Sequence, residues 1–411
     1  LHPGTPIWEE QAGAFFEGCQ IMERLPANSR RTQNRLLSPP YSSDVFQNEP
    51  DTDFALKENR QWIEKIFLEA EGLSFSPLPL VIEGEEIHTV YASGIDPSRP
   101  NITLYHYSLA DVPLIEKAIA CSLQEENVWG SSPFQTRSAL LKQIAHLFRQ
   151  KRGDLIGIMI ADGGKTVQEA DTEISEAIDF IEYYRLSSST GRPKGTILVT
   201  PPWNFPCSIP VGGIAAALIA GNCILFKPAP EVVLIGWHIA KLFWEGGISK
   251  RVLQFINCKE DPVGSYLVKH PHIDGIILTG ATETAKKFLR MHPGIELHAE
   301  TGGKNALIVT AMSDRDLAIR DLVHSAFGHA GQKCSACSLA ILEKEVYHDP
   351  HFKRQLLDAT KSLKVGSAWN PSTKVPPLIH PPEGSLYRAL TQLEEGESWL
   401  LKPIQDIHNP H

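Results

Sequence analysis

Residues 195–226 read GTILVTPPWNFPCSIPVGGIAAALIAGNCILF and contain no charged side chain. A membrane-spanning helix needs about 20 consecutive apolar residues, but prolines, glycines and Asn222 interrupt this run throughout. Lys194–Thr200 is typical of a strand that ends at a proline pair, and Ile209–Ala220 has helical spacing. We therefore predict a buried strand, a loop, a helix and a second strand, Cys223–Phe226.

Strands and helices continue to alternate downstream of this stretch. Short connections and mostly apolar strands are typical of a parallel sheet with helices on both faces, so we predict an α/β fold with a Rossmann-type sheet. A second, smaller α/β unit is predicted from about Lys304. The predicted helices are 232–245, 262–269, 283–291, 314–328, 350–364 and 385–393, and the predicted strands are 252–256, 273–278, 296–299, 305–309 and 339–342.

Helical patterns dominate the part of the chain upstream of the sheet. Predicted helices there are 12–25, 51–72, 112–124, 133–150 and 167–186, with two short strands, 86–91 and 101–107. The 411 residues can form two or three domains. We predict a linker or the tail of a preceding domain over 1–45, a nucleotide-binding domain over 46–299 and a truncated catalytic domain over 300–411. Part of an oligomerisation strand is expected near 190–200.

Composition narrows the class of protein. The formal charge is 39 − 48 = −9, and no long basic run is present, so binding to nucleic acid is disfavoured. With 42% hydrophobic and 21% charged residues, the chain resembles an ordinary globular protein without a membrane span. Its seven cysteines have no regular spacing, which favours reduced thiols. No basic-then-apolar leader follows Leu1, so we expect a cytoplasmic location.

One thiol has the setting of a nucleophile. Cys334 follows Gly331-Gln332-Lys333 just after a predicted helix, and its neighbours are small or polar. This is a loop context, in which reactive groups are common, and a nearby cation or a ring of backbone N–H groups would lower the pKa of the thiol. A buried structural cysteine is the alternative.

Two further residues supply what a thiol needs to oxidise an aldehyde. Glu300, before Thr301-Gly302-Gly303, is a carboxylate that can act as a base, and Asn204 is an amide that can hold an oxyanion. A solvated loop glutamate and an Asn that stabilises its own turn are the alternatives.

Other motifs give weaker signals. Cys337 forms Cys-x-x-Cys with Cys334, but no further ligands have matching spacing, so we expect no metal site. The usual Gly-x-Gly-x-x-Gly dinucleotide motif is absent. Gly164-Lys165-Thr166 lacks the remaining glycine and the preceding strand of a phosphate loop. Gly280, between a predicted strand and a predicted helix, is a better phosphate site.

Five ordered segments resemble the aldehyde dehydrogenase superfamily. They are residues 201–206 (PPWNFP), 226–231 (FKPAPE), 278–282 (LTGAT), 300–305 (ETGGKN) and 331–336 (GQKCSA). Residues 331–338 (GQKCSACS) and 177–184 (AIDFIEYY) are similar to the L-glutamate γ-semialdehyde (1-pyrroline-5-carboxylate) dehydrogenases of proline breakdown. In that branch the domain is often fused behind a proline dehydrogenase barrel. The first 40 residues, with residues 24–29 (RLPANS), resemble the tail of such a barrel.

The resemblance implies a role for each matched residue. Cys334 attacks the aldehyde, Asn204 holds the oxyanion and Glu300 activates water. Phe205 packs on the substrate and Ser335 binds its carboxylate. NAD is the implied cofactor, and the implied oligomer is homomeric. The residues expected to bind the cofactor are Trp203, Lys227, Glu231, Gly264, Thr279, Gly280, Ala281 and Gly302.

Two departures from the family pattern leave other functions open. The acid that follows Lys227 comes one residue later than in many members, and the Glu-x-Phe-Gly-Pro element that grips the nicotinamide ribose is not found. An aldehyde dehydrogenase that acylates coenzyme A is one alternative, although such enzymes lack a base like Glu300. A catalytically dead fragment that only binds nucleotide is another.

Overall fold

A computed structural model describes residues 2–24, 30–40, 43–72, 74–187 and 191–411. Its largest sheet has seven strands in the order β2-β1-β7-β6-β5-β8-β9. The five strands from β7 to β9 in this order are parallel, and β1 and β2 continue the sheet antiparallel at one edge. The strands are β1 (Leu80–Ile82), β2 (Glu85–Ile87), β5 (Thr196–Thr200), β6 (Cys223–Phe226), β7 (Leu253–Phe255), β8 (Gly275–Gly280) and β9 (Glu296–Thr301).

The order of the parallel strands creates a switch point in the sheet. The chain runs outward from β5 through β6 to β7, and then crosses back to place β8 on the other side of β5. In open α/β sheets, a ligand crevice forms outside the carboxyl ends of the two strands where the order reverses. The segments after Thr200 and Gly280 therefore border the expected crevice.

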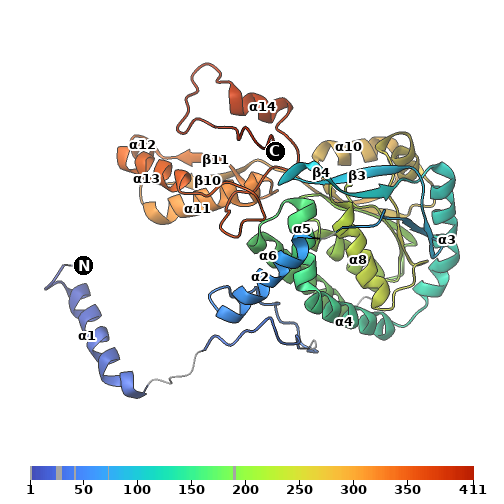
Figure 1. Cartoon of the computed structure of the whole chain (residues 1–411), viewed down its shortest axis with the longest axis horizontal. Coiled ribbons are helices and arrows are strands. Elements are labelled where there is room, and N and C mark those ends of the chain that lie inside the picture. The colour runs from blue at the N-terminus through green and yellow to red at the C-terminus, as the bar shows by residue number, and fades with distance from the viewer. Residues whose placement is uncertain (1, 25–29, 41–42, 73, 188–190) are drawn as a thin grey trace.

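Apolar side chains cover both faces of this sheet. Ile197 and Val199 of β5 pack in one buried cluster, whereas Leu198 between them packs in another. Since side chains alternate along a strand, these two clusters are the layers on the two faces. The surrounding helices are α2 (Lys57–Glu71), α3 (Val112–Gly130), α4 (Phe134–Gln150), α5 (Arg152–Gly163), α6 (Val167–Leu186), α7 (Ser208–Ile219), α8 (Val233–Glu245), α9 (Ser265–Lys269) and α10 (Thr282–Met291); Figure 1 shows their arrangement.

A smaller unit follows the large sheet. Strands β10 (Asn305–Val309) and β11 (Cys337–Leu342) pair in parallel, and their core includes Val309, Val323 and Phe352. The opposite face of this pair is open, since Ile308, Leu339 and Ile341 are 69, 55 and 46% exposed. The other elements are α11 (Arg315–Phe327), α12 (Lys344–Tyr347), α13 (Pro350–Lys361) and α14 (Gly384–Thr391), and β3 (Tyr91–Asp96) with β4 (Arg99–Ser108) forms a separate antiparallel pair.

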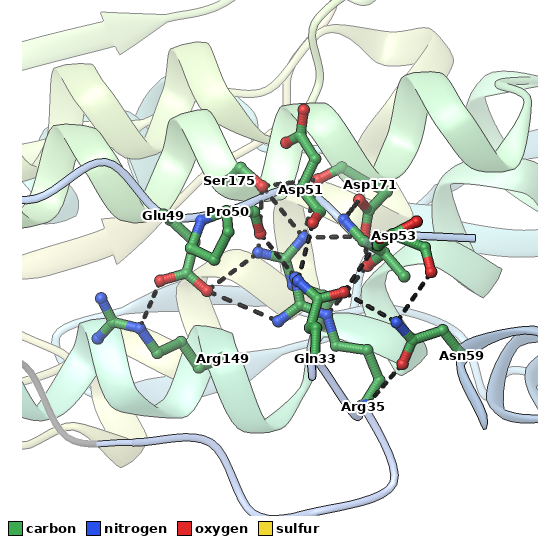
Figure 2. A network of polar contacts seen from close by, with 12 residues as sticks. Gln33, Arg35, Glu49, Pro50, Asp51, Asp53, Asn59, Arg149, Asp171 and Ser175 are labelled. Carbon is green, nitrogen blue, oxygen red and sulfur yellow. Dashed lines mark hydrogen bonds and ion pairs between the residues drawn. The ribbon is translucent and has the colours of Figure 1, made fainter. Parts of the chain in front are cut away.

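The N-terminal segment joins the helical layer through a buried polar network (Figure 2). Arg152 of α5 is 2% exposed and donates to Asp171 of α6 at 2.8 Å. Asp171 also accepts from the backbone and hydroxyl of Thr52, and Glu49 pairs with both Arg149 and Arg152. Because every charge in this network has a partner, the segment around residues 49–52 is held on α4, α5 and α6.

Helix α1 (Pro6–Ile21) lies apart from the rest of the chain in Figure 1. None of its residues is buried, and even the aromatic side chains of Phe15 and Phe16 are 66% and 63% exposed. Thr5 caps the start of the helix, since its hydroxyl accepts a hydrogen bond from the backbone N–H of Trp8.

The predicted fold is confirmed, with local differences. The sequence patterns missed β1 and the whole of α5, and predicted α2 to begin at Asp51 rather than Lys57. The expected oligomerisation strand near 190–200 differs most from the structure, because Thr196–Thr200 forms β5. Since β5 is paired with β6 on one edge and β8 on the other, these five residues offer no free edge to a second subunit.

Candidate active site

A cavity of about 670 Å³ opens at the switch point of the large sheet. Cys334, Asn204 and Glu300 all contribute to its wall, although they lie far apart in the sequence. The wall also contains every residue predicted to bind the cofactor: Trp203, Lys227, Glu231, Gly264, Thr279, Gly280, Ala281 and Gly302. The volume lies within the usual range of ligand sites, about 300–1,000 Å³.

The turn before Cys334 is unusually tight. His329, Ala330 and Gly331 all have positive φ, at 54°, 54° and 72°. A residue other than glycine in this conformation costs about 1–3 kcal/mol and persists only where its surroundings hold it. The backbone N–H of His329 donates to Glu169 of α6 at 2.7 Å, which is one such restraint. Cys334 itself is exposed at the cavity wall, so its sulfur is accessible to a ligand.

Asn204 connects the two loops that carry the predicted chemistry. It follows β5 in the proline-bracketed turn, and its side-chain amide donates to the backbone oxygen of Gln332 at 2.8 Å. Gln332 lies two residues before Cys334. A direct hydrogen bond therefore joins the loop of Asn204 to the loop of Cys334.

A buried cation supports this junction. The ammonium of Lys165 donates to the backbone oxygen of Asn204 at 2.7 Å, lies 3.3 Å from His329 Nδ1 and pairs with Glu173 at 2.7 Å. It also lies 4.4 Å from the centre of the Phe205 ring. Lys165 thus contacts residues on both sides of the junction between the Asn204 loop and the Cys334 loop.

Burial shifts the pKa of two groups beside Lys165. Burial raises the pKa of Glu173, while Lys165 and the backbone N–H groups of Cys207 and Ser208 oppose that rise. Those two N–H groups donate to the Glu173 carboxylate at 2.5 and 3.1 Å, at the start of α7. Burial and the nearby Lys165 lower the pKa of His329 to about 3. The neutral imidazole can therefore accept at Nδ1 from the lysine.

Glu300 lies on β9, at the free edge of the large sheet. It pairs in register with Thr279 of β8 and is exposed at the cavity wall. Gly302 and Gly303 follow it, and a Cβ on Gly302 would meet nothing within 4 Å. The Glu300 carboxylate therefore borders the same cavity as the Cys334 thiol.

The end of the cavity opposite the thiol has the features of a nucleotide site. Helix α10 starts beside Gly280 and Ala281 with no side-chain cap, so its first N–H groups are available to a phosphate. Lys227 also lines the cavity, and the described residues place no acidic partner within 4 Å of its ammonium. Glu231 accepts from His380 at 3.1 Å. These groups fit the phosphates and ribose of a dinucleotide.

Two predicted substrate residues do not reach the cavity wall. Phe205 stacks on His329 with ring centres 5.0 Å apart, and Ser335 is exposed beside the cavity. Sequence reasoning missed Lys165, Glu173 and His329, which carry no local signal because their contacts come from distant segments.

Four of the other six cysteines have different surroundings from Cys334. All seven are free, and Cys121, Cys207, Cys223 and Cys258 are buried, with the pKa of each raised by desolvation. Within the described residues, no group of three or more His, Cys, Asp or Glu side chains could hold a metal ion. No helix in the described ranges is both long and apolar enough to cross a membrane.

Comparison with known proteins assigns the family. The sequence model described as "Aldehyde dehydrogenase family" matches residues 88–401. The chain therefore belongs to the aldehyde dehydrogenase family, as the five ordered segments predicted. The family agrees with the predicted enzyme class, an NAD-dependent aldehyde dehydrogenase, and one similar solved structure contains bound NAD.

Three individual proteins show how far the similarity extends. The 1-pyrroline-5-carboxylate dehydrogenase of Geobacillus sp. (strain WCH70) is 32% identical over 361 residues, which are 81% of this chain and 70% of that protein. The 1-pyrroline-5-carboxylate dehydrogenase from Thermus with bound NAD has a TM-score of 0.75 at 30% identity, over 82% of this chain and 70% of that one. Proline utilization A (PutA) from Corynebacterium freiburgense has a TM-score of 0.75 at 38% identity, over 98% of this chain but only 38% of that one.

Proposed function

We propose that this chain carries the site for NAD-dependent oxidation of L-glutamate γ-semialdehyde to glutamate. The convergence of Cys334, Asn204 and Glu300 on one cavity is the observation that supports this proposal most strongly. The choice of aldehyde rests on the names of the similar proteins, which are 1-pyrroline-5-carboxylate dehydrogenases. The division into a nucleotide-binding domain over 46–299 and a catalytic domain over 300–411 is part of the proposal.

The first half of the reaction uses the thiol and the amide. The Cys334 thiolate attacks the aldehyde carbon, a sulfur–carbon bond forms, and the carbonyl electrons move onto oxygen. The Asn204 amide donates to this oxyanion. NAD supplies a hydride acceptor when bound. Once the hydride has left the carbon, the carbonyl reforms as a thioester on Cys334.

The second half of the reaction uses the carboxylate. Glu300 takes a proton from water, and the resulting hydroxide adds to the thioester carbon. The sulfur–carbon bond then breaks, which releases the carboxylic acid and returns the thiolate. The Gly302-Gly303 pair after Glu300 gives the side chain room to alternate between the water and a position away from it.

Lys227, Glu231 and the start of α10 would hold the nucleotide. The free N–H groups at Gly280–Thr282 suit the pyrophosphate, and Lys227 with Glu231 faces the adenosine ribose. A carboxylate near that ribose favours a 2′-hydroxyl over a 2′-phosphate, hence NAD over NADP.

Two variants test the chemistry. Cys334→Ala should abolish NADH formation from the semialdehyde while calorimetry still detects NAD binding. Glu300→Gln should form NADH only once per site, because the thioester forms but is not hydrolysed. Retained turnover in Cys334→Ala would exclude the mechanism. A wild-type chain that binds NAD but shows no turnover with any aldehyde would favour the fragment that only binds nucleotide, and a product dependent on coenzyme A would favour acyl transfer.

A fused proline dehydrogenase domain before residue 1 is a further part of the proposal. The similar PutA covers 98% of this chain, whereas the Thermus enzyme covers 82%. Helix α1 also exposes Ile7, Phe15 and Phe16, and Met22 directly follows the helix, each at 59% or more; such a surface is typical of a contact with a partner. The reading frame upstream of Leu1 should encode that domain; a frame that encodes an unrelated domain or a start codon would exclude the fusion. The cytoplasmic location and the homo-oligomer remain predictions.

A further inference from the structure

Two buried side chains from distant elements meet at the start of α8. The hydroxyl of Tyr105, on β4, accepts from the backbone N–H groups of Val233 and Leu234 at 3.1 and 3.2 Å. It donates to Asp162, on α5, at 2.8 Å. The other oxygen of Asp162 accepts from the N–H of Ile235 at 3.0 Å. Tyr105 is 2% and Asp162 0% exposed, so neither group has a solvent alternative.

These contacts replace the usual helix cap. The capping position of α8 is Val232, whose side chain cannot accept a hydrogen bond. Without Tyr105 and Asp162, three of the first N–H groups of a buried helix would lack a partner. The cap of α8 therefore comes entirely from two elements outside the helix.

The capped helix begins directly after one wall of the cavity. Lys227–Glu231 lines the cavity and runs into α8 through the short helical turn Pro230–Val232. The hydroxyl of Tyr107, on the same strand as Tyr105, also donates to the backbone oxygen of Pro230 at 3.4 Å. The positions of β4 and α5 thus fix the position of the segment Lys227–Glu231, whose first and last residues are predicted to bind the ribose.

The side chain of Tyr105 has no free space on the side that faces strand β3. Gly94 of β3 is its cross-strand partner, and a Cβ on that glycine would lie 2.1 Å from Cζ of the tyrosine ring. Such a distance is impossible for a real side chain, so the ring occupies the space that a side chain at residue 94 would need.

We propose that Asp162, acting through Tyr105, is a positioning residue that sets the affinity of the cavity for the adenosine half of the nucleotide. This inference rests on the proposed function, since it assigns that half of the cavity to adenosine. Neither Asp162 nor Tyr105 lines the cavity, so their effect passes through the α8 cap and the Lys227–Glu231 wall. A purely structural role would lower stability and leave the affinity unchanged.

Calorimetric titration with AMP and with NAD tests the proposal. Asp162→Asn replaces one acceptor oxygen by an amide nitrogen at constant shape, and Tyr105→Phe removes only the hydroxyl. Within each variant, the binding of AMP and of NAD should weaken by the same factor, about twofold to twelvefold for each lost hydrogen bond. Tyr105→Phe, which removes three hydrogen bonds, should have the larger effect. In steady state, KM for NAD should rise while kcat and KM for the aldehyde stay within about twofold.

A matched control separates affinity from stability. Asp171→Asn alters another buried carboxylate, in the network that holds residues 49–52 and away from the cavity. It should lower the melting temperature and leave the AMP affinity unchanged. If Asp162→Asn does not fold, Tyr105→Phe and Gly94→Ala, which displaces the same ring, decide the question. Folded variants that bind AMP like the wild type would overturn the positioning role alone. A wild-type chain that binds neither AMP nor NAD would overturn the proposed function as well.

Discussion

The ammonium of Lys165 lies 2.7 Å from the backbone oxygen of Asn204 and 2.7 Å from the carboxylate of Glu173. One buried cation therefore contacts both the turn that carries Asn204 and the acid that caps α7. Lys165 and Glu173 are 5% and 1% exposed, so both lose most of their hydration. Removal of either charge leaves the other buried without its partner.

Lys165→Met should lower the free energy of unfolding by about 3–5 kcal/mol, the usual cost of breaking a buried ion pair by deleting one side. Chemical denaturation at pH 7 measures it. Lys151→Met is the matched control, because Lys151 pairs with Asp154 at the surface, where both side chains are more than half exposed. That change should cost about 1 kcal/mol or less. Equal losses in the two variants would contradict the role assigned to Lys165.

Asn204→Ala should reduce kcat by about 100- to 1,000-fold, as expected when one donor to an oxyanion is removed. The amide also donates to the backbone of Gln332, so the variant tests both the chemistry and the link between the loops. Asn204→Ser, which keeps a shorter donor, should recover part of the rate. Single-turnover NADH formation measures the effect on the hydride step. Full activity in Asn204→Ala would place the oxyanion elsewhere.

His329 should make the fold sensitive to acid. Its pKa falls from an ordinary value of 6.5 to about 3 because it is buried beside Lys165 and Lys333. Between these two pH values the unfolded chain binds a proton that the folded chain does not, so stability drops as the pH falls from 6.5 toward 3. His238, whose pKa is lowered to about 4, acts with the same sign.

The pH dependence of His329→Asn separates the contributions of the two histidines. Its melting temperature should fall less between pH 7 and pH 4.5 than that of the wild type, because only His238 still contributes. Thermal melts at several pH values measure the difference. Parallel curves for variant and wild type would show that His329 ionises normally in the folded protein.

Asp162 should have the opposite dependence. Burial raises its pKa from 3.8 to about 7, although the hydrogen bonds from Ile235 and Tyr105 oppose that shift. Between these pH values the folded chain holds a proton that the unfolded chain lacks, so this group makes stability fall as the pH rises from about 4 to 7. The Asp162 carboxyl also faces Asp96, Tyr105 and Tyr107, and the substitution Asp162→Asn leaves these three residues unchanged.

The melting temperature of Asp162→Asn, compared with that of the wild type, tests this sign. The wild type should lose stability relative to the variant as the pH rises from 5 to 8, since only the wild type ionises a buried carboxyl. A constant difference over that range would mean that Asp162 has one protonation state throughout.

The sequence was sufficient for the parallel strands of the large sheet, but not for its strand β1 or for all the helices around it. Strands such as Cys223–Phe226 are buried on both faces, so they are short apolar runs between turn residues and are easily recognised. Helix α5 was missed because ten of its residues, including Arg152 and Asp162, are buried, so it lacks the one-sided periodicity of a surface helix. Strand β1 has only three residues and takes its position from β7.

The site was predictable where its chemistry depends on residue type and loop context. Cys334, Glu300 and Asn204 lie at the ends of predicted elements, and the topology brings those ends to one cavity. The residues that hold them were not predictable in this way. The Gly164-Lys165-Thr166 triplet gave no phosphate loop, and the role of Lys165 follows from contacts with residues 39 and 164 positions away.

The open face of the β10–β11 pair has a practical consequence. Ile308, Leu339 and Ile341 form a small exposed apolar surface on this strand pair, and β11 starts three residues after Cys334, the proposed nucleophile. Exposed apolar strand pairs associate with one another as the protein concentration rises. The activity per mole of protein should therefore decrease in concentrated solutions and recover on dilution or with a mild detergent. Such reversible association is distinct from inhibition by the product.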